Sequence, residues 1–239
     1  MDFQQLKAIV NNSENIVFFG GAGVSTESGI PDYRSGKAYI DGNSVLPEEV
    51  LSKSCLAGES ERFFQYYRKY LLHPNAKPND AHLALVELEN RTKLEAIITQ
   101  NVDGLHQQAG SKQVIELHGS TRQNYCMVCG EKYDLQFVLN SRQNIPRCQL
   151  CAGIVRPNIT LYEEDLDSGV IQIAKNLIAT SEILVIAGTS LSVYPAAGLL
   201  KYYRGECMII INETPTRYDG LANYIISDRV GKVMKSLII

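Results

Sequence analysis

The chain has 239 residues, of which 45% are hydrophobic and 21% charged, with a formal net charge of −3 and a pI near 5.8. This composition is typical of a soluble globular protein with a sizeable core, and its acidic balance argues against a protein that coats nucleic acid. No apolar run followed by a cleavage site begins the chain, and no stretch of about 18 apolar residues occurs. We therefore expect a cytoplasmic protein with no secretion signal and no transmembrane helix.

Apolar strands alternate with amphipathic helices along most of the chain. The expected helices cover 2–12, 61–72, a segment capped by Asn79 or Asp80, a segment from about 170, and 195–205. The expected strands cover 15–21, 95–101, 113–120, 182–190 and 207–212. This alternation predicts an α/β fold, with a parallel sheet and helices on both of its faces.

Polar residues and glycines follow the expected strands at the point where each one ends. They are Gly20–Gly23, Gln100–Asp103, His118, Gly188–Ser190 and Asn212. Ligands of such folds bind beyond the carboxyl ends of the strands. The sequence therefore predicts one shared binding crevice at this edge of the sheet.

The glycine-rich loop at 20–23 would let the backbone approach a ligand, with a helix expected to start near Ser25 and offer its N-terminus to a pyrophosphate. The alternative is a tight strand-to-helix turn without a ligand. A hydride-transferring dehydrogenase would need a second strand ending in Asp or Glu about 20 residues further on, but a loop rich in Gly and Pro follows instead. A P-loop is disfavoured because no Lys stands where it would reach phosphates.

Four cysteines have the spacing of a tetrathiolate metal site, with C-x2-C repeated after 18 residues: Cys126, Cys129, Cys148 and Cys151. Four protein ligands leave no open position, so we expect one structural Zn²⁺ that holds together a small insert at 121–157. A redox dithiol is the alternative reading. A nucleic-acid-binding zinc ribbon is disfavoured, because between Gly119 and Pro157 five Arg or Lys face two Asp or Glu, and the thiolates remove further positive charge.

Several stretches together resemble the sirtuin family. They are "GAGVSTESGIPDYR" (21–34), "TQNVDGLH" (99–106), "ELHGS" (116–120), the four cysteines, "GTSLSVYPAAGL" (188–199) and "INETPT" (211–216). The resemblance spans nearly the whole chain and is that of a compact bacterial-type member. It implies a Rossmann-type NAD domain (1–30, 76–120 and 158–239), a cofactor loop with a helical insert (31–75) and a zinc module (121–157).

The resemblance implies removal of acyl groups, acetyl first, from protein lysines with consumption of NAD. The acyl oxygen would attack the nicotinamide-ribose carbon as nicotinamide leaves. His118 would then act as general base on a ribose hydroxyl, as suits an imidazole near neutral pH, and Asn101 would share the catalytic site. Mono-ADP-ribosyl transfer within the same family, and a non-catalytic NAD-sensing or zinc-ribbon adaptor, remain the alternatives. No direct nucleic-acid or membrane partner is expected.

Particular residues of this chain match the family's cofactor contacts. Tyr33 would shield the reacting ribose carbon, Arg34 would order the loop, and Asp103 would accept the nicotinamide amide. The expected NAD-binding residues are Ala22, Gly23, Thr26, Ile30, Asp32, Tyr33, Arg34, Gln100, Asn101, Val102, Asp103, His118, Gly188, Thr189, Ser190, Asn212, Glu213 and Asp228.

The family binds its peptide as an extra strand between two loops, which match 159–164 and 191–197 here. The expected peptide contacts are Thr160, Tyr162, Val193 and Tyr194. Relatives often have Phe-Gly-Glu where this chain has Tyr162-Glu163-Glu164. We expect the lost glycine to change the backbone and the two acids to favour basic residues beside the target lysine.

The helical insert lacks the Tyr-x-x-Arg of succinyl-removing members and offers Phe64 and Tyr67 instead. We therefore expect an apolar acyl pocket that is not succinyl-selective. Outside the motifs, we expect His73, His82 and His106 at surfaces or helix ends, Cys55 and Cys207 as small buried hydrophobes, and Arg68-Lys69 on a solvated helix face.

Overall fold

The computed structural model describes residues 3–32, 38–40 and 42–238. Tyr33 and Arg34, both expected in the cofactor loop, lie outside these residues. No helix in the described ranges is long and apolar enough to cross a membrane.

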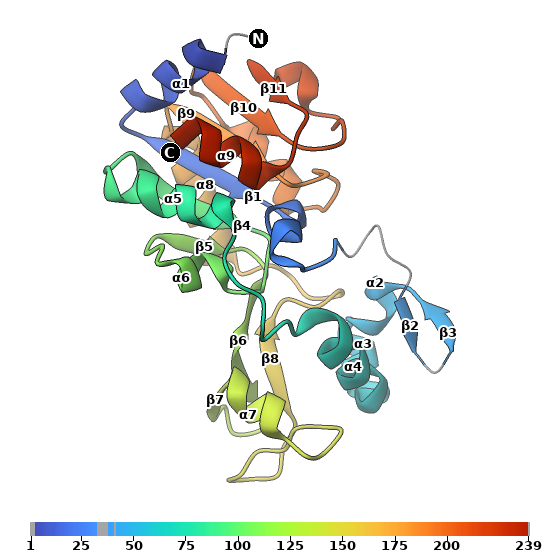
Figure 1. Cartoon of the computed structure of the whole chain (residues 1–239). Helices are drawn as coiled ribbons and strands as arrows, with labels where there is room; N and C mark the ends of the chain where they lie inside the picture. Colours follow the sequence, from blue (N-terminus) through green and yellow to red (C-terminus); the bar gives the residue numbers. More distant parts are fainter. Residues whose placement is uncertain (1–2, 33–37, 41, 239) are drawn as a thin grey trace.

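A six-stranded parallel sheet forms the larger part of the molecule (Figure 1). Its strand order is β11-β10-β9-β1-β4-β5. The strands are β1 (Ile16–Gly20), β4 (Leu94–Thr99), β5 (Val114–Glu116), β9 (Ile183–Ala187), β10 (Cys207–Ile211) and β11 (Tyr224–Ile226). All its neighbouring strands run parallel, which confirms the predicted fold class.

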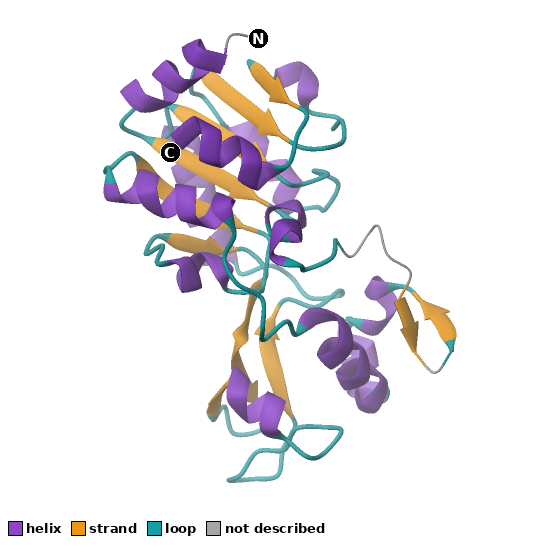
Figure 2. Ribbon diagram, in the orientation of Figure 1, coloured by secondary structure: helices purple, strands orange, loops and turns teal. Residues whose placement is uncertain are grey.

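Helices cover both faces of this sheet, and two apolar clusters fill the layers between (Figure 2). The helices α1 (Phe3–Asn12), α5 (Asp80–Asn90) and α9 (Val230–Ile238) pack on one face, and α8 (Ser168–Thr180) and the 3-10 helix η4 (Ala196–Tyr202) pack on the other. Alternate residues of β1 point to opposite clusters, Phe18 to the first and Phe19 to the second. The apolar run of β1 is therefore explained by burial on two sides.

A smaller part of the molecule lies below the sheet in Figure 1 and consists of two insertions into the larger part. The helical insert comprises β2 (Ala38–Ile40), β3 (Asn43–Val45), α2 (Pro47–Val50), α3 (Lys53–Gly58), α4 (Ser60–Tyr66) and the π-helical turn η3 (Tyr67–Leu71). The cysteine-containing module comprises β6 (Gly119–Cys126), β7 (Lys132–Asp134), α7 (Leu135–Asn140) and β8 (Val155–Ile159), with strand order β7-β6-β8. One apolar cluster, including Phe63, Phe64, Val138 and Ile159, joins the two insertions.

The segment after β1 forms two 3-10 turns, η1 (Ala22–Val24) and η2 (Thr26–Ser28), so the expected helix near Ser25 is wrong. Gly29 adopts a left-handed conformation with φ of 82°, and Pro31 follows. These residues turn the chain before an α-helix can develop. The expected helix at 195–205 is likewise a 3-10 helix, η4.

His82 on α5 and His106 on α6 (Leu105–Ala109) lie in the first turns of their helices, so the expectation of helix ends is met. Their side chains are nevertheless 0% and 1% exposed, with ring centroids 4.7 Å apart, because these two helices pack against each other. The expectation of a solvated helix face is wrong for Arg68. Arg68 is half-buried and donates from Nη1 and Nη2 to the carbonyl oxygens of Ser141 and Gln143. The predicted cap of α5 is confirmed, since Asn79 Oδ1 accepts the N–H of Ala81 at 2.9 Å.

Candidate functional site

The ends of β1, β4, β9 and β10 meet at one place, as the sequence predicted. The Gln100 amide donates to the Gly20 carbonyl oxygen at 3.0 Å, and Gln100 Nε2 donates to Thr189 Oγ1 at 3.0 Å. The Gly188 amide in turn donates to the Ile211 carbonyl at 3.0 Å. The glycine loop, the segment after β4 and the segment after β9 are therefore neighbours at one edge of the sheet.

The glycines of the loop are required by contacts within the protein. A Cβ atom at Gly23 would lie 2.7 Å from the Gly188 Cα, and one at Gly21 would lie 2.7 Å from the Thr189 Cβ. The Gly23 amide also donates to the Gly188 carbonyl oxygen at 2.8 Å. Packing between two loops, in addition to any approach to a ligand, therefore explains why side chains are absent here.

A partly buried hydrogen-bonded chain links the glycine loop to the segment after β4. Asn101 Nδ2 donates to Ser25 Oγ at 3.1 Å, and Ser25 Oγ donates to Asp103 Oδ2 at 2.7 Å. Asp103 Oδ1 accepts the Leu105 amide at 2.9 Å. The side chains of Asn101 and Asp103 are thus held in fixed orientations. Sequence reasoning missed Ser25 as a functional candidate because it treated that position only as the start of a helix.

His118 lies just after β5, and its imidazole is oriented by the backbone. Its Nδ1 lies 2.9 Å from the Gln100 carbonyl oxygen. Because a carbonyl oxygen can only accept, Nδ1 carries the proton and Nε2 has the free lone pair. Burial lowers the pKa of His118 below its ordinary value, against the opposing effect of the Gln100 hydrogen bond. The ring is therefore neutral at pH 7 and suited to accept a proton at Nε2.

The remaining expected cofactor residues lie along the same strand ends. Asn212 follows β10 and donates from Nδ2 to the Thr214 carbonyl at 2.9 Å. Asp228 follows β11, accepts the Arg229 amide at 2.8 Å and pairs with Lys232, one turn into α9. Its contacts within the protein thus stabilise the start of that helix.

Two exposed tyrosines mark the two loops that the sequence analysis assigned to a peptide. Tyr162 is 49% exposed and Tyr194 is 59% exposed. The Tyr194 hydroxyl lies 3.0 Å from that of Tyr218, and the Arg217 guanidinium lies 5.6 Å from the Tyr194 ring centroid. The backbone of Val193 accepts the Ala197 amide at 2.9 Å.

The acidic pair in the first loop is hydrogen-bonded to other parts of the protein. Glu163 keeps a left-handed backbone, with φ of 71°, and its carboxylate accepts two hydrogen bonds from Ser54. Glu164 makes a two-pronged ion pair with buried Arg156, at 2.6 and 3.0 Å, which lowers the pKa of the Glu164 carboxyl. Both carboxylates therefore have partners within the protein, and the preference for basic peptide residues stays a prediction.

The four cysteine sulfur atoms lie within 4.8 Å of one another. Cys126 and Cys151 Sγ are 3.4 Å apart, and Cys129 and Cys148 Sγ are 3.6 Å apart. A tetrahedral Zn²⁺ with bonds of about 2.3 Å separates its sulfurs by about 3.8 Å, so the cluster fits this ion. The N–H groups of Val128 and Leu150 point at Cys126 and Cys148 Sγ, at 3.4 Å each, as suits thiolate ligands.

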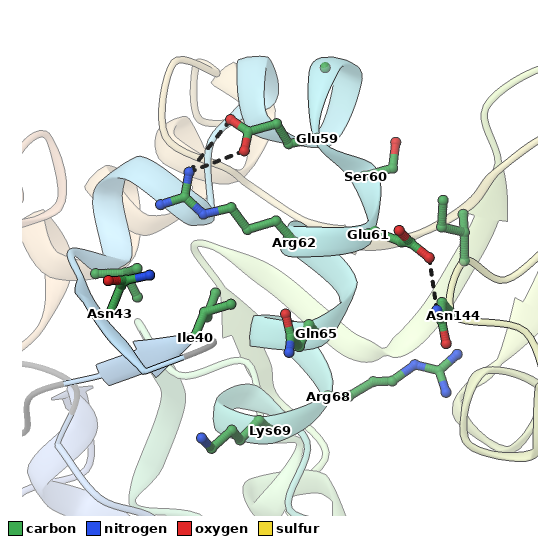
Figure 3. A pocket seen from close by; sticks show the side chains of 13 residues that line it. Ile40, Asn43, Glu59, Ser60, Glu61, Arg62, Gln65, Arg68, Lys69 and Asn144 are labelled. Carbon is green, nitrogen blue, oxygen red and sulfur yellow. Dashed lines mark hydrogen bonds and ion pairs between the residues drawn. The ribbon is translucent and has the colours of Figure 1, made fainter.

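A cavity of about 1170 Å³ lies elsewhere, in the smaller part of the molecule (Figure 3). It is bounded by α4, the β2–β3 hairpin and residues 144–145, and its lining carries charges of both signs. Glu59 pairs with Arg62, and Glu61 Oε1 accepts from Asn144 at 2.8 Å. None of the residues expected to bind NAD lines this cavity.

The parallel sheet and the cysteine cluster together define a Rossmann-type α/β protein with a four-cysteine zinc module. A model of the Sir2 family matches residues 21–195, and the chain belongs to this family. It is 51% identical to the NAD-dependent protein deacetylase of Clostridium acetobutylicum, covering 98% of this chain and 97% of that one. It is also 51% identical to the enzyme of the same name from Clostridium perfringens, with the same coverage.

Solved structures agree with this assignment. Sir2Tm bound to a propionylated peptide superimposes with a TM-score of 0.88 at 33% identity, covering 99% of this chain and 97% of that one. A Sir2 complex with an inhibitor, 2′-O-acetyl-ADP-ribose and a deacetylated peptide gives a TM-score of 0.85 at 33% identity, covering 98% and 96%.

Proposed function

We propose that this protein is an NAD-dependent protein-lysine deacetylase that transfers the acetyl group to ADP-ribose and releases nicotinamide. Relatives that match almost its whole length carry the name NAD-dependent protein deacetylase. The observation that carries the proposal is the His118 imidazole, whose Nδ1 is held by the Gln100 carbonyl and whose Nε2 is left as a base. Gln100, whose carbonyl holds this base, also donates its amide to the Gly20 carbonyl oxygen at the start of the glycine loop.

The acyl oxygen of the modified lysine attacks the nicotinamide-ribose carbon as the bond to nicotinamide breaks. His118 Nε2 then takes the proton of a ribose hydroxyl, and that oxygen attacks the acyl carbon. Water completes the release of lysine and of an acylated ADP-ribose. A Sir2 relative has been solved with 2′-O-acetyl-ADP-ribose and a deacetylated peptide, the products that this sequence of steps requires.

The Asn101–Ser25–Asp103 chain holds polar groups rigidly beside the base. Asp103 uses one lone pair on each oxygen for Ser25 and Leu105, so a further lone pair on each can accept the nicotinamide amide. Asn101 is fixed through Ser25 and can orient a ribose hydroxyl or a water. Fixed dipoles of this kind lose no energy to reorganisation during the reaction.

The other cofactor contacts follow the strand ends. The first loop, including Ala22, Gly23, Thr26, Ile30 and Asp32, and the segment after β9 with Gly188, Thr189 and Ser190 would hold the phosphates and the adjoining ribose. Asn212, Glu213 and Asp228 would border the adenosine end, and Val102 would touch the nicotinamide. Tyr33 and Arg34 would complete the loop over the cofactor.

Zn²⁺ would be held by the four cysteines and would be structural, since four protein ligands leave no position for water or substrate. The zinc module at 121–157 and the insert at 31–75 would then form the smaller unit against which peptide and cofactor bind. Thr160, Tyr162, Val193 and Tyr194 would line the peptide channel. Because the aromatic face of α4 is apolar and buried, acetyl and longer apolar acyl groups would be preferred to succinyl.

The test is to incubate the protein with peptides that carry acetyl-, propionyl- and succinyl-lysine, with and without NAD, and to identify the products by mass spectrometry. We expect NAD-dependent loss of acetyl, with nicotinamide and acetyl-ADP-ribose formed in equal amounts. His118→Ala should stop turnover while NAD binding by calorimetry persists. Turnover without NAD would overturn the proposal, and ADP-ribose attached to protein instead of acetyl-ADP-ribose would show ADP-ribosyl transfer.

A further inference from the structure

Glu163 occupies a backbone conformation that suits glycine. Its φ of 71° lies in the left-handed region, where the Cβ of an L-residue approaches the following carbonyl oxygen. A glycine would hold the same turn without this strain. The side chain of Glu163 therefore needs contacts that offset the conformational cost.

Such contacts are made with helix α3, which lies 109 residues away in the sequence. Glu163 Oε2 accepts the Ser54 amide at 2.9 Å, and Oε1 accepts the Ser54 hydroxyl at 2.8 Å. Ser54 is the second residue of α3, where a helix has backbone N–H groups without intrahelical partners. A carboxylate is the side chain best suited to this position, because it accepts at both oxygens and complements the helix N-terminus.

The backbone beside Glu163 is attached to the same helix. The Tyr162 amide donates to the Leu51 carbonyl oxygen at 2.9 Å, and the Lys53 amide donates to the Tyr162 carbonyl oxygen at 3.0 Å. The Cys55 amide is satisfied by Ser52 Oγ at 3.0 Å. The first turn of α3 is therefore satisfied by its own cap and by the loop, and Glu163 supplies two side-chain bonds from the loop to this turn.

The other end of the loop is attached to the candidate base. The Thr160 amide donates to the His118 carbonyl oxygen at 2.9 Å. Residues 160–163 thus span from His118 to α3, and half-exposed Tyr162 lies between the two attachments. Loss of the Glu163 bonds would release the loop at residue 163, whereas Tyr162 and Thr160 keep their own backbone hydrogen bonds.

We propose that Glu163 is a positioning residue for the acylated peptide. By accepting two hydrogen bonds from Ser54, its carboxylate fixes the backbone of residues 160–163 in the conformation that the peptide binds. This inference rests on the proposed function, in which this loop is one wall of the peptide channel. Glu163 performs no chemical step and does not touch NAD. Its loss should therefore weaken peptide binding, while the affinity for NAD and the rate of the bound complex stay nearly unchanged.

The experiment compares Glu163→Ala, Glu163→Gln and Ser54→Ala with wild type, and uses Glu61→Ala as the matched control. Glu61 is a carboxylate of the helical insert that accepts from Asn144 and not from Ser54 (Figure 3). We expect Glu163→Ala to raise the KM for acetyl peptide about tenfold, equivalent to about 1.4 kcal/mol, because both charge-assisted hydrogen bonds to Ser54 are lost. The KM for NAD and kcat should change by less than about twofold on the same scale.

Glu163→Gln keeps an acceptor for the Ser54 amide and should restore most of the peptide affinity. The double variant Ser54→Ala with Glu163→Ala should have a peptide KM no higher than that of Glu163→Ala alone, because both changes remove the same hydrogen bonds. Calorimetry with the acetyl peptide measures the peptide affinity of each variant without turnover. The melting temperature of each variant is measured beside its kinetics.

An unchanged peptide KM in Glu163→Ala, with normal wild-type turnover, would overturn this inference alone. Equal rises in the KM for peptide and for NAD, with a lowered melting temperature, would also overturn it by showing a merely structural role. A wild-type protein that neither binds nor deacetylates the peptide would overturn this inference and the proposed function together.

Discussion

Gly119 follows the candidate base directly, and replacing it by Ala tests how the site is built. Gly119 has φ of 74°, and a Cβ there would overlap the Asn158 carbonyl oxygen and lie 3.0 Å from its carbonyl carbon. Both atoms belong to the backbone of β8, which pairs with β6 at this point, so no rotamer change can relieve the overlap. The strands must separate where the His118 carbonyl accepts the Thr160 amide.

Two costs combine in Gly119→Ala. The left-handed backbone costs an L-residue about 1–2 kcal/mol, and forced backbone shifts from overpacking cost about 1–3 kcal/mol. The free energy of unfolding should therefore fall by about 2–5 kcal/mol on the sum of these terms. Displacement of His118 by 1 Å would lower kcat/KM by about a hundredfold.

Gly130→Ala is the control for the conformational term. Its φ of 75° matches that of Gly119, but a Cβ there meets no described atom within 4 Å. Urea unfolding in the presence of zinc should show Gly119→Ala to be less stable than Gly130→Ala by about 1–3 kcal/mol, the overpacking term alone. Equal stabilities for the two variants, or a fully active Gly119→Ala, would refute the reasoning.

Three further predictions concern protons and the metal. Because burial lowers the pKa of His118, the acidic limb of kcat/KM against pH should lie below about 6.5, the ordinary imidazole value; a limb above pH 7 would contradict the assignment. Burial lowers the pKa of His82 to about 4 and that of His106 to about 3, so only the unfolded chain takes up these protons between pH 6.5 and 4. Stability should therefore decrease on acidification through that range, by up to about 1.4 kcal/mol per histidine and pH unit, and urea midpoints that stay constant from pH 7 to 5 would rule this out. Removing Zn²⁺ with a chelator should lower the melting temperature and abolish activity, whereas added zinc should restore both; full activity in demonstrably zinc-free protein would disprove a structural role.

Local patterns in the sequence were enough for the main architecture. Two-sided burial makes the central strands continuous apolar runs, and this signal does not depend on distant residues. The spacing of Cys126, Cys129, Cys148 and Cys151 predicted one cluster because each C-x2-C forms a single turn, and the structure brings their sulfurs together. The polar residues after the strands likewise lie at one edge of the sheet, because parallel strands end at the same edge.

The partners of individual side chains depended on contacts between distant segments. No neighbour in the sequence indicated that Gly23 packs against Gly188. Likewise, no residue near Glu163 in the sequence indicated that its carboxylate would bond to Ser54. The burial of His82 and His106 likewise followed from the packing of α5 against α6. The periodicity of a sequence shows which face of a helix or strand is apolar. Which atoms pack against that face depends on how distant segments of the chain come together in the folded protein.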